Sequence, residues 1–137
     1  MSELARFGVS LEFDLLKSLD LLMRQKGYTN RSEYIRDLVR DDLVKKTWVS
    51  GSAVAGAIIL VYDHHKRALV NLLTDIQHDY HELIVSGQHI HLDHHNCLEI
   101  IAVKGQPKKI EELANRLRAA KGVKHGALSV TSTGKEL

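Results

Sequence analysis

The chain has 137 residues, of which 44% are hydrophobic, and a formal net charge of +2 at pH 7. This length suits one ordinary domain or two small ones, and the absence of any apolar run near the roughly 20 residues that cross a bilayer excludes a transmembrane helix. The N-terminus lacks a signal-peptide pattern, so we expect a cytoplasmic protein with no membrane partner. So small a net charge does not identify a nucleic-acid binder, because such domains usually concentrate basic residues on one face.

The first predicted element is a short, half-buried strand at residues 5–12, where apolar and other residues alternate with the period of two that strands require. Its apolar side consists of Phe7, Val9 and Leu11. Its other side carries Arg6, Gly8 and Ser10.

Two helices follow this strand. The first runs from about Asp14 to Lys26, and Gly27 is placed to end it in a left-handed conformation. The second begins at Asn30, which can cap it while Glu33 reaches back in a capping-box arrangement. One strand and two helices in about 45 residues cannot enclose a core, and a lone strand leaves its backbone groups unpaired. We therefore expect a symmetric dimer in which two such strands pair antiparallel.

A short linker at residues 49–52 is predicted between a first domain at residues 1–48 and a second at residues 53–137. In the second domain the apolar pattern predicts the order β-α-β-β-α-β. This order is the ferredoxin-like plan, a sheet with two helices on one face. The predicted fold class is therefore α+β.

The second domain contains all nine histidines and the only cysteine. His89 and His91 are two apart on a predicted strand, so both imidazoles project from one face. If the following "DHHN" turns the chain back, Cys97 opens the neighbouring strand beside His91. A fourth ligand must come from elsewhere, and His78 and His81, at the end of the preceding helix, are the candidates. Such a donor set suits Zn(II), Cu(II) or Ni(II), and the spacing does not choose among them.

Other polar groups nearby allow two interpretations. Alternation puts Glu99 on the same face as Cys97, where it can hydrogen-bond a ligand histidine or serve as a general base. His94 and His95 lie in the turn and are either solvated or bind metal weakly. The remaining histidines favour an ordinary surface role; these are His64, His65 and His125.

The N-terminal elements also suit DNA binding. A two-stranded ribbon fits the major groove, where Arg6 and Ser10 would face base edges. The start of the second helix offers free backbone N–H groups for a phosphate, together with Asn30, Arg31 and Ser32. The alternative is a ribbon that only dimerises.

Five stretches of this chain, taken together, strongly resemble the nickel-responsive regulator (NikR) family, and the resemblance covers nearly the whole chain. They are "RFGVSLE", "GYTNRSEYIRDLVRDDL", "QHDYH", "HIHLDHHNCLEI" and "VKHG". The resemblance implies a ribbon-helix-helix DNA-binding domain joined to a ferredoxin-like, ACT-type domain. The second domain would form a homotetramer and bind one Ni(II) per subunit.

The resemblance also implies roles for individual residues. The nickel ligands would be His89, His91 and Cys97 of one subunit and His78 of a neighbouring one, in a square plane. The DNA-facing positions would be Arg6, Gly8 and Ser10. Gly8 departs from the family, which typically has a hydroxyl or other side chain there. An accessory cation would bind near Glu33 and Asp37.

The implied function is a nickel-responsive repressor of nickel uptake genes whose operator binding is promoted by Ni(II). The main alternative is a nickel or zinc storage or delivery module in which the ribbon only dimerises. An enzyme that uses a metal with Glu99 as base ranks third, because no second acid or base is evident. We therefore predict a non-enzymatic regulator.

Overall fold

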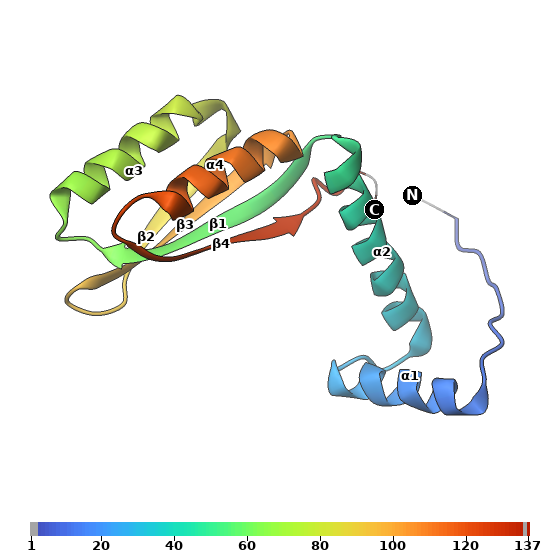
Figure 1. Cartoon of the computed structure of the whole chain (residues 1–137). Coiled ribbons are helices and arrows are strands. Elements are labelled where there is room, and N and C mark those ends of the chain that lie inside the picture. The colour runs from blue at the N-terminus through green and yellow to red at the C-terminus, as the bar shows by residue number, and fades with distance from the viewer. Residues whose placement is uncertain (1–2, 136) are drawn as a thin grey trace. The chain divides into compact units, whose positions relative to one another are not determined.

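The computed structural model describes residues 3–135 and 137 (Figure 1). The chain divides into two compact units, Met1–Asp41 and Asp42–Leu137. None of the described helices combines the length and the apolar character that a membrane span needs.

The first unit contains helix α1 (Phe13–Gln25) and the start of helix α2 (Arg31–Ser50). α1 begins and ends one residue earlier than predicted, and Gly27 follows it with a φ of 84°, as its left-handed role required. Asn30 caps α2, since its Oδ1 accepts a hydrogen bond of 2.9 Å from the backbone N–H of Glu33. The reciprocal bond from the Asn30 N–H to the Glu33 carboxylate does not form in the described chain, so one side chain alone makes the cap.

The predicted strand at residues 5–12 does not form in the single chain. A strand requires a second strand to accept and donate its hydrogen bonds, and no described segment of this chain pairs with it. Its apolar side chains are therefore left in solvent, with Phe7 76% and Val9 56% exposed. The predicted strand is therefore absent from the single chain, in which no described segment offers it a partner.

The rest of the first unit also lacks a core. No residue of α1 is buried, and among the described residues of this unit Tyr34 alone is buried. The helices are held together by a few polar and ring contacts. The side chain of Arg31 donates two hydrogen bonds of 2.9 Å to the carboxylate of Asp20, and the rings of Tyr28 and Tyr34 pack 5.1 Å apart.

The second unit has the predicted order β-α-β-β-α-β. Its elements are β1 (Val54–Asp63), α3 (Arg67–Asp79), the short helix η1 (His81–Leu83), β2 (Ile84–His91), β3 (Asn96–Gly105), α4 (Pro107–Ala119) and β4 (Val123–Thr131). The strands form one sheet in the order β2-β3-β1-β4, and every neighbouring pair is antiparallel. Both α3 and α4 cover the same face of this sheet (Figure 1). The ferredoxin-like prediction is therefore confirmed.

α2 continues to Ser50 and ends where Gly51 takes a φ of 86°. The predicted linker at residues 49–52 therefore begins with helical residues. Close to this end, the indole N–H of Trp48 donates a hydrogen bond of 2.7 Å to the backbone carbonyl of Thr131. This bond ties the last turns of α2 to the end of β4.

The core of the second unit lies between the sheet and its two helices. Because successive strand residues point to opposite faces, alternate residues of β1 and β3 enter it. They are Val54, Ile58, Leu60 and Tyr62 from β1, and Cys97, Glu99, Ile101 and Val103 from β3. The helices contribute mainly Leu69, Leu73, Ile76, Ile110, Leu113, Ala114 and Leu117. Cys97 and Glu99 are thus core residues that share one face of β3.

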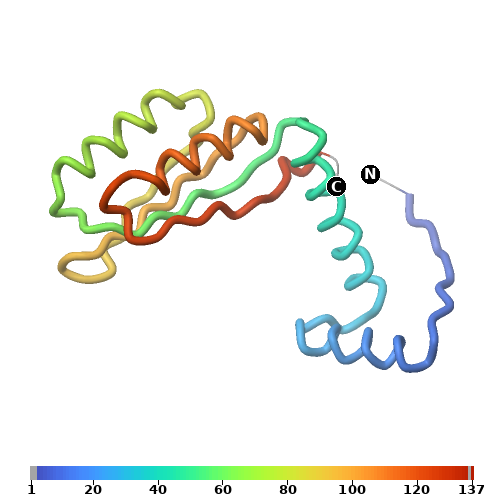
Figure 2. The backbone as a smooth tube through the Cα atoms, in the orientation of Figure 1, coloured from blue at the N-terminus to red at the C-terminus, as the bar shows by residue number. Residues whose placement is uncertain are grey.

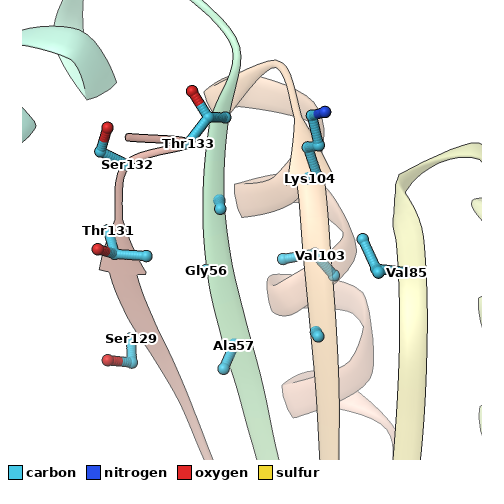
Figure 3. A pocket seen from close by; sticks show the side chains of 11 residues that line it. Gly56, Ala57, Val85, Val103, Lys104, Ser129, Thr131, Ser132 and Thr133 are labelled. Carbon is cyan, nitrogen blue, oxygen red and sulfur yellow. The ribbon is translucent and has the colours of Figure 1, made fainter. Parts of the chain in front are cut away.

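A shallow depression is lined by small and hydroxyl-bearing side chains, with Val85 and Lys104 at its edge (Figure 3). Several of its residues, among them Ala57, Ala102 and Ser129, alternate with the buried strand positions and so belong to the sheet face away from the helices. No histidine, cysteine or carboxylate lines this depression among the described residues. The candidate metal ligands of the second unit therefore lie elsewhere, on the helix-covered face of the sheet and at its ends.

The ion pair between Asp20 and Arg31 leads to a pH-dependent prediction. The hydrogen bond from Arg31 lowers the pKa of the Asp20 carboxyl below its ordinary value. Because the pKa of Asp20 is lower in the folded unit, the ion pair contributes its full stabilisation at pH values above about 3.9, the pKa of an unfolded aspartate. This stabilisation is lost as the pH falls through the pKa of Asp20 in the folded unit. In an NMR titration, Arg31→Ala should raise the pKa of Asp20 toward about 3.9, whereas Arg36→Ala should leave it unchanged. An unchanged Asp20 pKa in Arg31→Ala would contradict this assignment.

Candidate metal centre

The β2–β3 hairpin brings three of the sequence-predicted ligands to one end of the sheet. In its antiparallel register His91 lies opposite Cys97, and His89 lies opposite Glu99. Directly opposed residues of two paired strands point to the same face. The Cys97 Sγ lies 3.8 Å from the Nδ1 of His89. The thiol and the His89 imidazole therefore lie within reach of one ion, and the register places His91 on the same, helix-covered face of the hairpin.

The separation of Cys97 and His89 fits a single bound metal ion. A metal–sulfur bond of about 2.3 Å and a metal–nitrogen bond of about 2.0 Å, the usual values for zinc, add up to roughly 4.3 Å. One ion can therefore bind both atoms at a bent angle without any movement of the backbone. Cys97 is only 1% exposed, while the side chain of His89 is 58% exposed. The thiol thus comes from the interior and the imidazole from the surface.

Glu99 lies beside this group as a buried carboxylate, 3% exposed. Its Oε1 accepts a hydrogen bond of 2.6 Å from the Tyr62 hydroxyl, and its Oε2 accepts one of 3.0 Å from the side-chain amide of Gln77. The Nε2 of His89 lies 3.4 Å from the same Oε2. Both carboxylate oxygens are therefore engaged, which favours a role in orienting His89 over a role as a general base.

Tyr62 was not predicted as part of the site. It lies opposite Cys97 on β1, and its hydroxyl is 3.4 Å from the Nδ1 of His89. Burial, and next the hydrogen bond to Glu99, raises the pKa of Tyr62 above its ordinary value. The hydroxyl therefore stays protonated and donates to Glu99. The alternation of an apolar strand indicates that Tyr62 is buried, but only the pairing of β1 with β3 places it against Cys97.

His78 and His81 lie at the end of α3 and just after it, and both are exposed. Their rings are 6.0 Å apart. The preceding residue, Gln77, points inward to Glu99, and neighbouring helical side chains diverge by roughly 100°. His78 consequently points away from the core. In the part of the chain that the structure describes, no hydrogen bond, ion pair or ring contact joins it to His89, His91 or Cys97.

His64 is a second residue at this end of the sheet whose position the sequence pattern did not indicate. Its ring stacks on that of His91, with centroids 4.4 Å apart and planes inclined by 3°. Its Nδ1 is buried and has no hydrogen-bond partner, and burial lowers the pKa of this imidazole, which favours its neutral form. His64 is therefore more enclosed than an ordinary surface histidine, although the sequence placed it among those. Its neighbour His65 and the turn residues His94 and His95 are exposed.

The candidate DNA-contacting residues lie in two places in the first unit. Arg6, Gly8 and Ser10 are exposed in the segment before α1. A side chain added at Gly8 would meet no atom within 4 Å. At the start of α2, Asn30 uses its Oδ1 as the helix cap, Arg31 is paired with Asp20, and Ser32 is exposed.

Glu33 and Asp37, the residues near which an accessory cation was predicted, are one turn apart on α2 and so share a face. The carboxylate of Asp37 already accepts a hydrogen bond from the Tyr28 hydroxyl. It also lies 3.7 Å from the Nε of Arg36. A cation here would have to compete with these partners.

Two family models match the chain. The model described as the NikR C terminal nickel binding domain matches residues 55–131. The model of the ribbon-helix-helix protein, copG family, matches residues 5–46. The first match covers β1 to β4, and the second covers the segment before α1, all of α1 and most of α2.

Relatives named "Putative nickel-responsive regulator" align over nearly the full length. One from Syntrophus aciditrophicus is 57% identical and covers 98% of both chains. One from Chlorobium limicola is 54% identical over 98% of this chain and 100% of its own. One from Chlorobaculum tepidum is 57% identical over 96% of this chain and 98% of its own.

A solved structure supports the fold alone. An uncharacterized protein from Thermotoga maritima superposes with a TM-score of 0.52 at 12% identity, over 58% of this chain and 98% of its own. The family assignment rests instead on the sequence matches, because the nickel-binding model covers more than half of the chain and the relatives cover almost all of it. The chain therefore belongs to the nickel-responsive regulator family, with a ribbon-helix-helix DNA-binding domain before its nickel-binding domain.

Proposed function

We propose that this regulator represses nickel uptake genes and that Ni(II), bound at a site shared between subunits, promotes its binding to operator DNA. The observation that carries this proposal is the approach of Cys97 and His89, with 3.8 Å between Sγ and Nδ1, on a hairpin to which His78 makes no contact that the described residues show. His91, opposite Cys97, supplies a third donor. One thiolate with imidazoles suits Ni(II) in a square plane.

The fourth ligand would be His78 of a neighbouring subunit. This assignment is supported by the direction of α3, because Gln77 points inward to Glu99 and leaves His78 on the outer side. From that position His78 can reach the hairpin of a second chain more readily than the hairpin of its own chain. Each subunit would then hold one Ni(II), and occupancy of the site would depend on assembly.

The first unit supports a dimeric DNA-binding form. Its apolar side chains, including Phe7, Val9 and Phe13, are exposed in the single chain. Antiparallel pairing of residues 5–12 from two chains would satisfy their backbone groups and bury this apolar side. The paired strands would present Arg6 and Ser10 to base edges in the major groove. With contacts through the second units, we propose a tetramer made of two such dimers.

Nickel and DNA would be coupled through the elements that meet at the metal site. Glu99 contacts His89 and also accepts a hydrogen bond from Gln77, the residue before His78. An ion that joins the hairpin of one subunit to His78 of another would restrain α3 and the residues from about 64 to 81 and so favour one arrangement of the subunits. Coupling between two ligands is reciprocal, so DNA would strengthen nickel binding by the same factor.

The central prediction is that Ni(II) increases operator affinity. The measurement is fluorescence anisotropy with DNA from a nickel-uptake promoter at a fixed salt concentration. With one Ni(II) per subunit the dissociation constant for this DNA should be at least fivefold lower, because allosteric coupling commonly changes affinity by about 5- to 150-fold. Salt must be held constant because phosphate contacts alone change affinity by orders of magnitude. Equal affinity with and without Ni(II) would contradict the proposal and favour a storage or delivery module.

A second prediction concerns the metal ligands. Cys97→Ala should remove the thiolate-to-nickel charge-transfer absorption, because it removes the only thiol of the chain. His78→Ala should weaken or change this band, whereas His81→Ala, which alters an equally exposed neighbour, should not. If the absorption band of Cys97→Ala had unchanged strength, the assignment of Cys97 as a nickel ligand would be wrong.

Subunit mixing separates a shared site from one within a single chain. Tetramers reassembled from equal amounts of Cys97→Ala and His78→Ala chains contain pairs in which one subunit offers the intact hairpin and the other offers His78. A shared site should therefore recover part of the absorption band. Ligands drawn from one chain would give no recovery, because every chain in the mixture is defective.

The third prediction concerns base recognition. Arg6→Ala should abolish the preference for operator over unrelated DNA while nickel absorption stays intact, because the two sites lie in different units. One arginine-to-guanine contact accounts for about 1 to 3 kcal/mol of discrimination. Lys121→Ala removes the same charge from an exposed position in the second unit and should preserve the preference. Loss of both DNA preference and nickel absorption in Arg6→Ala would indicate misfolding rather than lost recognition.

A further inference from the structure

A second group of metal-ligating side chains lies beside the proposed nickel site but shares no ligand with it. The group contains Asp63 at the end of β1, His65 in the turn that follows, and His95 in the turn between β2 and β3. One potential ligand atom from each lies within 4.8 Å of the other two, and no other such trio is present in the described residues. The turn after β1 and the turn after β2 lie at the same end of the sheet (Figure 2).

Asp63 and His65 are already held in one arrangement. The Oδ1 of Asp63 accepts a hydrogen bond of 2.9 Å from the backbone N–H of His65. The same oxygen lies 3.2 Å from the Nδ1 of the His65 ring. The carboxylate is therefore fixed against the imidazole by a local turn, and little conformational freedom remains to be lost when both bind an ion.

The position of His95 is fixed independently by Asp93. The Oδ1 of Asp93 accepts hydrogen bonds from the backbone N–H groups of His95 and Asn96, at 2.9 and 2.8 Å. The His95 ring meets the His65 ring edge-on, with centroids 5.7 Å apart. Two separately ordered turns thus bring their imidazoles to the same place.

The distances suit a divalent ion. Bonds of about 2.0 to 2.2 Å to nitrogen and carboxylate oxygen allow two ligand atoms to lie up to roughly 4.3 Å apart. The ligand atoms of this group lie within 4.8 Å of one another, so small side-chain rotations would bring them to bonding distance from one ion. Two imidazoles and one carboxylate, without a thiolate, suit borderline first-row ions and leave coordination positions for water.

We propose that Asp63, His65 and His95 form a second divalent-cation site within a single subunit, which binds ions such as Ni(II), Zn(II) or Co(II) more weakly than the thiolate site. This goes beyond the proposed function, because it needs no neighbouring subunit and no cysteine. Three exposed or half-exposed ligands and an open coordination sphere account for the lower affinity. A bound ion would join the turn after β1 to the turn that separates His91 from Cys97, so a second metal would stiffen the end of the sheet that carries the first.

The site can be tested with the full chain in a background that lacks the thiolate site. Cys97→Ala/His89→Ala removes two proposed nickel ligands and leaves the second group untouched. Titration with Co(II), followed by its d–d absorption and by calorimetry, should give one ion per subunit with no thiolate charge-transfer band. Adding Asp63→Asn, His65→Ala or His95→Ala should weaken this binding at least tenfold.

Two further variants serve as controls in the same background. His125→Ala, at an exposed strand position outside the group, should leave Co(II) binding unchanged, and circular dichroism should show that each variant stays folded. The proposal is overturned if the background binds no Co(II). It is also overturned if His125→Ala or the neighbouring His94→Ala lowers affinity as much as His95→Ala. Neither result bears on the thiolate site, because nickel absorption of the unmodified chain tests that site separately.

Discussion

The pairing of β3 with β1 on one side and β2 on the other is the constraint on which the metal-binding end of the protein depends. This double pairing places Cys97 opposite Tyr62 and opposite His91 at once. A shift of one residue in either register would turn the side chains of a strand to the other face. The thiol would then leave the core and the imidazoles would leave the helix-covered side. The large apolar residues of β1 and β3 fix the register, since they must reach the helices.

Burial of Glu99 among these strands connects packing to chemistry. An unpaired carboxylate in an apolar interior is strongly unfavourable, and here Tyr62 and Gln77 offset that cost with hydrogen bonds from β1 and α3. Removing a partner from such a group costs more than the bond itself. The network therefore holds three elements and the His89 ring in one arrangement. It also links the hairpin to the end of α3, beside the exposed His78.

The two units differ in how far one chain can fold them. The second unit buries a continuous core between its sheet and α3 and α4. The first buries almost nothing, and its candidate strand pairs with no other segment between residues 3 and 135, so in our proposal another copy of the chain completes its structure. In our proposal the metal ligands lie on a unit that folds by itself, and the DNA-contacting strand lies on a unit that assembly completes. Assembly would then influence DNA binding directly.

The sequence alone determined the helices of both units and the strands of the second, because local signals specify them: helical spacing, the Asn30 cap, the glycine after α1 and the alternation in β1 and β3. It also predicted that His89, His91 and Cys97 lie together, and they share one hairpin, whose register needs no distant contact. Only the tertiary structure decided that Tyr62, Gln77 and His64 belong to the same end, and that His65 and His95 approach Asp63. The order of strands in a sheet is set by long-range packing, which no local pattern encodes. For the same reason the strand at residues 5–12, readable from its alternation, does not form in a chain that lacks its partner.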